Sequence, residues 1–422
     1  KREIFGWAMF DFANSSYTTV VITVVYAEFF TARVVPAGGG ARDSYWSLAI
    51  VLSTLLALSL SPLVGAICDK SGRKKIYLLG TTVACSVATA ALALVGPGAL
   101  GAGVLLVALS NAAFMLSESF CASFLPELAT EQTMGKVSGL GWGFGYFGGL
   151  ASLLLVMPIV DVEGPAEVPR TQAAMLVTAL FFLLASLPTL VLVRERSRPA
   201  PGFERAPLGQ LLRAGLGELR QTAGLARQHW VLFRFLLAFM VYMAGLEAVI
   251  KFVGIYARSE LHFGMGDVSV LFLILQLSAA AGAVAFGLLE ARLGAKPTVL
   301  ATLGLWFIAV MSIYGLDSLS AALGVGSKKL FFAIALLAGT GIGATQSSSR
   351  TVVGLLAPPG RSAQIFGFWG MFSRLGTVLG MSFGFVADML HSRRTALLLV
   401  ASFFVVGAAM LWPIPIDRPK RA

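Results

Sequence analysis

Residues 65–75 read GAICDKSGRKK, and residues 287–296 read GLLEARLGAK. Each stretch places two glycines seven residues apart, with an acidic residue before the second glycine and basic residues around it. Each also follows one long apolar stretch and precedes another. The chain therefore contains an internal repeat, whose two copies are offset by 222 residues at this point.

Apolar stretches fill the sequence on both sides of these loops. Hydrophobic residues make up 57% of the 422 residues, and charged residues make up 13%, about half the share of a soluble domain. This composition excludes a soluble enzyme, a disordered chain and a disulfide scaffold. A helix needs about 20 apolar residues to cross a bilayer, and twelve stretches meet that length: 5–33, 45–67, 76–96, 101–125, 138–160, 171–193, 231–256, 268–290, 297–316, 329–349, 364–387 and 395–415.

A second pair of glycines supports the repeat. Gly139 and Gly148 are nine residues apart in the fifth span, as are Gly367 and Gly376 in the eleventh. Equivalent spans in the same order and with the same sidedness indicate halves related by an axis along the membrane normal. We therefore predict an all-α membrane protein of twelve transmembrane helices, in two six-helix bundles related by pseudo-two-fold symmetry. The bundles are residues 1–193 and 231–422, and residues 194–230 form a cytoplasmic linker.

The net charge of +11 could indicate nucleic-acid binding, but the positions of the charges argue against it. With both termini in the cytoplasm, twenty of the 32 Lys and Arg residues fall on the cytoplasmic side and eight on the opposite side. This bias matches the positive-inside rule. We expect a multi-pass protein of the cell membrane, the inner membrane of a bacterium, with both termini cytoplasmic and no nucleic-acid partner.

The linker contains one amphipathic pattern. Its leucines keep helical spacing, and arginines recur every seven residues on another face: Leu208, Leu212, Leu216 and Leu219, with Arg213, Arg220 and Arg227. This pattern predicts a helix on the inner leaflet with its arginines toward anionic headgroups. A solvated linker helix is the alternative.

The loop at residues 65–75 suggests a gate. Glycine at a helix end permits close packing and a tight turn. Asp69 lies among basic residues, where a charge network can latch one helix end to another and favour one conformational state. We predict a gating role for Gly65, Asp69, Gly72, Arg73 and Lys75. The alternative is a basic loop that only fixes topology.

The same five residues match the loop signature of the major facilitator superfamily. Residues 6–17, GWAMFDFANSSY, resemble the first span of its vacuole-effluxer-like branch, as do FLP at 124–126, GKVSGLG at 135–141 and GATQSSSR at 343–350. The resemblance covers essentially the whole chain. It implies a twelve-helix transporter that alternates between inward-open and outward-open states. Because fungal members of the branch are autophagy-linked vacuolar amino-acid exporters, it also implies amino-acid efflux.

Two features differ from the drug and proton antiporters of the superfamily. Residues 101–125 contain no Arg, and residues 139–149 contain no Pro. Many proton-coupled members carry an Arg in the fourth span, and drug antiporters commonly carry a Gly-Pro pattern in the fifth. Both absences argue against a drug exporter driven by proton antiport.

Polar side chains within the spans are candidates for substrate contact. An ionisable residue at membrane depth costs about 2.5–3.5 kcal/mol on insertion scales, so such residues are usually functional. In the first span, Asp11 and Asn14 share a helical face. We predict substrate binding by six residues: Asp11, Asn14, Tyr146, Gln276, Gln346 and Arg374.

The repeat also pairs residues of the two halves. Aligning Pro126 with Pro358 sets Glu118 opposite Arg350, which could either form a salt bridge that closes the cytoplasmic side or hold a zwitterion. We favour the bridge and add both residues to the gate. A second alignment sets Tyr146 opposite Arg374, which favours a substrate or anion contact.

Proton coupling would require a carboxylate, because the three histidines lie at span edges or in loops. Asp11, Glu118 and Glu247 are the candidates, since burial raises carboxyl pKa values toward working pH. Two alternatives remain: Glu247 and Lys251 only neutralise each other, or Asp11 pairs with a basic loop residue.

These observations favour a secondary active transporter of a small polar or zwitterionic solute, amino-acid-like, by alternating access with proton coupling. The alternative is an exporter of hydrophobic drug or lipid cargo. We expect no enzyme, metal or cofactor, because the sequence has neither a clustered His and Asp set nor a nucleotide-binding loop. The expected partners are the small-molecule substrate, the lipid bilayer and protons, and we expect a monomer.

Overall fold

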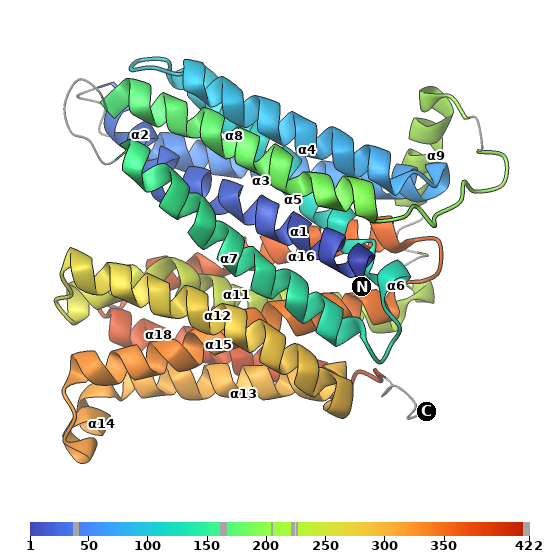
Figure 1. Ribbon diagram of the computed structural model, residues 1–422. Helices are drawn as coiled ribbons and strands as arrows, with labels where there is room; N and C mark the ends of the chain where they lie inside the picture. Colours follow the sequence, from blue (N-terminus) through green and yellow to red (C-terminus); the bar gives the residue numbers. More distant parts are fainter. Residues whose placement is uncertain (37–41, 161–166, 204–205, 221–223, 225–226, 417–422) are drawn as a thin grey trace. The chain divides into compact units, whose positions relative to one another are not determined.

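The computed structural model describes residues 1–36, 42–160, 167–203, 206–220, 224 and 227–416 (Figure 1). Residues 204–205, 221–223 and 225–226 of the predicted linker and the basic C-terminal residues 417–422 lie outside the described part. Within it, all regular structure is helical. The elements are α1 (Arg2–Ser16), η1 (Tyr17–Val24), α2 (Tyr26–Phe29), η2 (Phe30–Val34), α3 (Arg42–Ser71), α4 (Lys74–Ala91), η3 (Leu92–Leu94), α5 (Leu100–Ala122), α6 (Leu125–Leu128), α7 (Met134–Val160), α8 (Glu167–Leu192), α9 (Leu208–Arg220), α11 (Trp230–Glu260), α12 (Met265–Leu293), α13 (Ala295–Tyr314), α14 (Leu316–Leu323), α15 (Ser327–Leu356), α16 (Ser362–Gly380), α17 (Ser382–Met389) and α18 (Arg393–Leu411).

Eleven helical segments of the described residues are long and apolar enough to cross a membrane. They correspond to the second to twelfth predicted spans. The first predicted span, 5–33, is also helical, but it is divided into α1, η1, α2 and η2. The segments η1 and η2 are π-helical, with wider turns than an α-helix. The chain is therefore the predicted all-α, multi-pass membrane protein.

The described residues form two compact units. Unit 1 comprises residues 1–128, 144–221 and 358–371, and unit 2 comprises 129–143, 222–357 and 372–422. The helices α7 and α16 each contribute residues to both units. The predicted division at 193 and 231 remains a prediction about the folding domains.

The two units pack their helices in the same way. In unit 1, α1 packs on α8, and α3 and α4 pack on α5. In unit 2, α11 packs on α18, and α12 and α13 pack on α15. The contact of α4 with α8 likewise recurs between α13 and α18. These are equivalent pairs among the first and second six spans, so the internal repeat of the sequence is a structural repeat.

Glycines bring α7 and α16 close to the first helix of a unit. A Cβ atom on Gly148 would lie 2.0 Å from the carbonyl oxygen of Phe12 in α1. One on Gly376 would lie 2.8 Å from the carbonyl oxygen of Met240 in α11. Gly148 and Gly376, the second glycines of the two pairs, thus make equivalent close contacts with the first helix of each unit. Small residues commonly allow such close approach between membrane helices.

The predicted linker helix is present as α9. It packs on α3, where a Cβ on Gly215 would lie 2.6 Å from Ile67. Leu211 is buried, whereas Leu212 and Leu216 are exposed. The side chains of Leu208, Leu219 and Arg220 lie outside the described part. The position of α9 on the inner leaflet remains a prediction.

Candidate functional site

The turn between α3 and α4 requires glycine for two reasons. Gly72 has a φ of +63°, in the left-handed region that ends helices, and its N–H donates to the Cys68 carbonyl oxygen at 3.0 Å. A Cβ atom at this position would also lie 2.3 Å from the backbone of Arg198 and Pro199. The second glycine of the sequence pattern therefore both ends α3 and admits a later segment of the chain.

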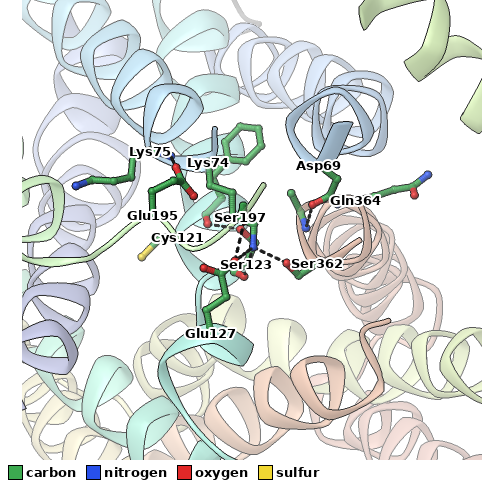
Figure 2. Close-up of polar contacts among 12 residues, drawn as sticks. Asp69, Lys74, Lys75, Cys121, Ser123, Glu127, Glu195, Ser197, Ser362 and Gln364 are labelled. Carbon is green, nitrogen blue, oxygen red and sulfur yellow. Dashed lines mark hydrogen bonds and ion pairs between the residues drawn. The ribbon is translucent and has the colours of Figure 1, made fainter. Parts of the chain in front are cut away.

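The Asp69 carboxylate lies at the N-terminus of α16 (Figure 2). Its two oxygens accept the backbone N–H groups of Ala363 at 3.0 Å and Gln364 at 2.8 Å. The first N–H groups of a helix have no partner within it and carry partial positive charge, so a carboxylate stabilises them. Gly65 makes this approach possible, because a Cβ there would lie 2.5 Å from the Ala363 carbonyl oxygen. We call these four residues the Asp69 latch.

A buried lysine lies beside the latch. The ammonium group of Lys74 donates to the Ser123 carbonyl oxygen at 3.1 Å and to the Ser362 hydroxyl at 2.6 Å, and it forms an ion pair with Glu127. Its Nζ also lies 5.6 Å from the centre of the Phe124 ring. Lys74 therefore joins α4, α5, α6 and the start of α16 (Figure 2).

Lys74 was not among the predicted gating residues, whereas its two neighbours Arg73 and Lys75 were. Arg73 is exposed. Lys75 contributes its backbone N–H, which donates to Glu195 Oε2 at 2.9 Å, and Figure 2 shows its ammonium group pointing away from Lys74. The sequence shows three consecutive bases, but only the start of α4 at Lys74 determines which one faces inward.

Residues 193–203, which follow α8, lie across this turn, and we call them the strap. The Ala200 N–H donates to the Lys70 carbonyl oxygen at 2.9 Å, and the Ser197 hydroxyl donates to Glu127 Oε1 at 2.9 Å. At its start, Arg196 Nη2 lies 2.7 Å from Glu3 Oε2. The strap thus ties the end of the first bundle to the α3–α4 turn.

Two carboxyl groups at the strap have shifted pKa values. The Arg196 guanidinium holds the pKa of Glu3 below its ordinary value. Burial raises the pKa of Glu195, and the nearby Glu127 carboxylate raises it further, while the hydrogen bond from Lys75 opposes both.

The predicted substrate residues of unit 1 lie on α1 and α7. Asn14 is buried, and its side-chain oxygen Oδ1 has no hydrogen-bond partner in the described structure. Asp11 and Tyr146 are half-buried. A Cβ on Gly145 would lie 3.3 Å from the Asp11 carbonyl oxygen, so α1 and α7 are close here. Asn14 lies three residues before the start of the π-helical turns of η1, and such turns are frequent at functional sites.

The predicted residues of unit 2 lie on four helices. Gln276 in α12, Gln346 in α15 and Arg374 in α16 are half-buried. Glu247 and Lys251 of α11 form the expected i,i+4 pair, with 3.9 Å between Glu247 Oε2 and Lys251 Nζ.

The two residues of the predicted salt bridge belong to different units. Glu118 is half-buried in α5 of unit 1, and Arg350 is buried in α15 of unit 2. Arg350 donates to the Ser138 hydroxyl at 3.1 Å and to its carbonyl oxygen at 2.8 Å. Its guanidinium carbon lies 5.4 Å from the centre of the Trp142 ring. Arg350 therefore fastens the start of α7 to α15, a contact that the sequence did not indicate.

Known proteins resemble the chain over nearly its whole length. Residues 33–422 match the family described as vacuole effluxer Atg22 like. The uncharacterised MFS-type transporter YxiO of Bacillus subtilis is 26% identical, over 97% of this chain and 94% of that protein. Autophagy-related protein 22 of Kluyveromyces lactis is 24% identical, over 89% of this chain and 80% of that protein.

Solved structures share the fold. The human organic anion transporter MFSD10 has a TM-score of 0.75 to this chain at 14% identity, and the match covers 97% of this chain and 99% of that one. The proton:xylose symporter XylE has a TM-score of 0.72 at 13% identity, covering 98% of this chain and 94% of that one. The chain belongs to the Atg22-like vacuole effluxer family of major facilitator superfamily transporters.

Proposed function

We propose that the protein is a secondary active transporter of a small polar or zwitterionic solute, amino-acid-like in its chemistry. The observation that carries this proposal is the polar content of the spans. Asn14 has a buried side-chain oxygen without a partner, and leaving such a group unpaired costs about 1–3 kcal/mol. A solute with an amino or hydroxyl donor would recover that cost, which a hydrocarbon ligand would not.

Half-buried ionisable and amide groups of the spans are the other candidates for substrate contact. Asp11 can hold an ammonium group, and Arg374 can hold a carboxylate by two parallel hydrogen bonds. Tyr146, Gln276 and Gln346 add neutral donors and acceptors. A zwitterion needs both signs of charge, and the spans offer both.

The alternative cargo, a drug or lipid, has less support. An apolar cavity of about 30 Å³ lies in unit 2, lined by Phe252, Tyr256, Phe331 and their neighbours. Pockets for drug-sized molecules measure about 300–1,000 Å³. This cavity is therefore too small to hold such cargo. A second pocket of about 550 Å³, beside Leu94 and Leu176, is an open surface hollow, whereas such sites bury most of their ligand.

Transport would proceed by alternating access, with the Asp69 latch and the Lys74 contacts closing the cytoplasmic side in one state. The description of the matching family, vacuole effluxer, favours export as the direction of transport. We place the protein in the cell membrane as a monomer with both termini cytoplasmic, and we propose protons as the coupling ion, with Asp11 as their first carrier.

A thermal-shift screen of the purified protein tests the substrate class. Amino acids should raise the melting temperature of the wild type, and they should not do so for Asn14→Ala or Arg374→Ala. Gln132→Ala, at an exposed position outside the spans, is the control that should keep the shift. Stabilisation by lipids or drugs but by no polar solute would favour the hydrophobic cargo instead.

Uptake into proteoliposomes then tests transport and coupling. Wild-type protein should accumulate the solute found in the screen when a pH gradient is imposed. Asp11→Asn should lose this pH-driven uptake and keep exchange, because exchange of solute for solute needs no net proton movement. An unchanged pH dependence in Asp11→Asn would remove Asp11 as the carrier.

A further inference from the structure

Glu290 is a buried carboxyl group that the proposed transport mechanism does not use. It lies near the end of α12 and is 4% exposed. A Cβ atom on Gly135, in the first turn of α7, would lie 2.7 Å from Glu290 Oε1. The hydroxyl groups of Ser348 and Thr351 in α15 also lie beside the carboxyl group. Glu290 thus fills a closed space among three helices of unit 2.

The environment of Glu290 differs from that of Asp69. Both carboxyl groups belong to the repeated loop pattern, and both meet the first turn of a helix. Asp69 accepts two backbone N–H groups there. Glu290 accepts none in the described structure, and its Oε2 atom is buried without a hydrogen-bond partner. An anionic Glu290 would therefore have only the hydroxyl groups of Ser348 and Thr351 to compensate its charge.

The nearby cations are engaged elsewhere or face outward. Arg350 of α15 donates to Ser138, and Lys296 of α13 donates to the carbonyl oxygens of residues 412 and 414. Lys136 of α7 and Arg292 of α12 are exposed. Among the described residues, none of the four forms an ion pair with Glu290.

An ionised carboxylate that is buried without a cation or an N–H donor costs several kcal/mol, whereas a neutral carboxylic acid costs much less. A proton on the carboxyl group would also turn the unpartnered oxygen into a hydroxyl. We propose that Glu290 binds a proton in this conformation and releases it when the first turn of α7 moves away from α12. The contact between these two helices would then weaken as the pH rises.

The proton site does not depend on transport, although its use in a transport cycle rests on the proposed function. Tight packing makes the contact a suitable switch. A Cβ on Gly139 would lie 2.4 Å from the Ala283 carbonyl oxygen, and one on Gly287 would lie 2.5 Å from that of Gly135. Because closely packed helix interfaces tend to switch between discrete arrangements, proton binding and helix contact would change together.

The test compares melting temperatures of the wild type and Glu290→Gln, which mimics the protonated form, from pH 5 to pH 9. Unfolding exposes the carboxyl group to water, where glutamate titrates near pH 4.3. If the folded state keeps the proton, it loses stability relative to the unfolded chain as the pH rises. Glu290→Gln lacks this loss. Its melting temperature should therefore gain about 3 °C on that of the wild type between pH 5 and pH 9.

Glu131→Gln is the matched control, because Glu131 is exposed and lies just before α7. Its melting temperature should differ from that of the wild type by the same amount at every pH. A pH-independent difference for Glu290→Gln, or a lower melting temperature of this variant at pH 9, would overturn the proposal. So would stabilisation of the wild type by Na⁺ over choline that Glu290→Gln lacks, since the ligand would then be an alkali cation.

Infrared spectroscopy gives an independent readout. The wild type and Glu131→Gln should show a protonated carboxylic-acid band at neutral pH that Glu290→Gln lacks. An identical band in all three proteins would contradict the proton site. Neither measurement uses a substrate, so failure here leaves the proposed transport function standing, and failure of uptake leaves the proton site standing.

Discussion

Lys74 is the residue on which four elements converge. Its ammonium group is nearly fully buried, and it meets Ser123, Ser362 and Glu127. Removing one partner of a buried ion pair leaves an uncompensated charge, which costs about 3–5 kcal/mol. Lys74→Met should therefore destabilise the protein by about 3 kcal/mol, measured by thermal or denaturant unfolding in detergent.

Lys75→Met is the control for Lys74→Met. The ammonium group of Lys75 points away from the cluster, and only its backbone N–H is used, so the expected loss is below about 0.5 kcal/mol. The double variant Lys74→Met, Glu127→Gln should recover part of the loss. Equal effects of the two lysine variants would show that burial of Lys74 does not determine stability.

Asp69 could be singled out from the sequence, whereas Lys74 and Glu290 could not. The pattern predicted a gating role for Asp69, because an acid among bases at a helix end can form a charge network with another helix end. It did not identify Lys74 or Glu290. Both depend on which way a side chain turns relative to distant segments: the end of α5, α6 and α16 for Lys74, and α7 for Glu290. The spacing of neighbouring residues does not determine either side-chain orientation.

The packing of α12 on α15 depends on glycines with no space for a side chain. A Cβ on Gly343 would lie 1.9 Å from the Ala279 carbonyl oxygen, and one on Gly282 would lie 2.2 Å from that of Thr340. Because backbone cannot rotate aside as a side chain can, Gly343→Ala must separate the helices. We expect a loss of about 2 kcal/mol, seen as a lower melting temperature.

Gly304→Ala is the matched change in α13, where nothing lies within 4 Å of an added Cβ. Alanine favours the helix over glycine by up to about 1 kcal/mol, so this variant should melt at the same temperature as the wild type or higher. A similar loss in both variants would mean that helix propensity, not helix contact, sets the effect.

Whole helices were predicted more reliably than their details. Apolar stretches of about 20 residues gave the second to twelfth spans, because hydrocarbon thickness fixes that length. The first span was also expected, but its π-helical turns in Tyr17–Val24 were not. Hydropathy depends on the composition of a stretch and not on its hydrogen-bond pattern, so it cannot distinguish a π-helical turn from an α-helical turn.

The described residues repeat one packing scheme in two units, and the sequence already indicated this through paired glycines. The sequence did not indicate that residues 129–143 of the first half group with unit 2, or that residues 358–371 of the second half group with unit 1. These are the starts of α7 and α16, the helices that Glu290 and Asp69 meet. One acidic residue of each repeated loop therefore contacts a helix that contributes residues to both units.

This arrangement is the basis for the proposal that Asp69 controls the balance between the two conformational states. Asparagine is nearly isosteric with aspartate but has no charge, and charge-assisted hydrogen bonds are about twice as strong as neutral ones. Asp69→Asn should therefore weaken the hold on α16 with the fold intact. A loss of about 1.4 kcal/mol would change the ratio of inward-open to outward-open protein about tenfold. Electron-resonance distances between labels at Arg194 and Arg292, exposed positions of units 1 and 2, measure that ratio.

The control for this measurement is Asp388→Asn, the same chemical change at an exposed position in α17. It should leave the distance distribution as in the wild type. A second label pair at Leu94 and Leu323, exposed residues of units 1 and 2, should change in the opposite sense in Asp69→Asn, because alternating access opens one side as it closes the other. Distances that match the wild type at both pairs would exclude the Asp69 latch as a gate. Distances that lengthen at both pairs would indicate loss of the fold rather than a shift between two states.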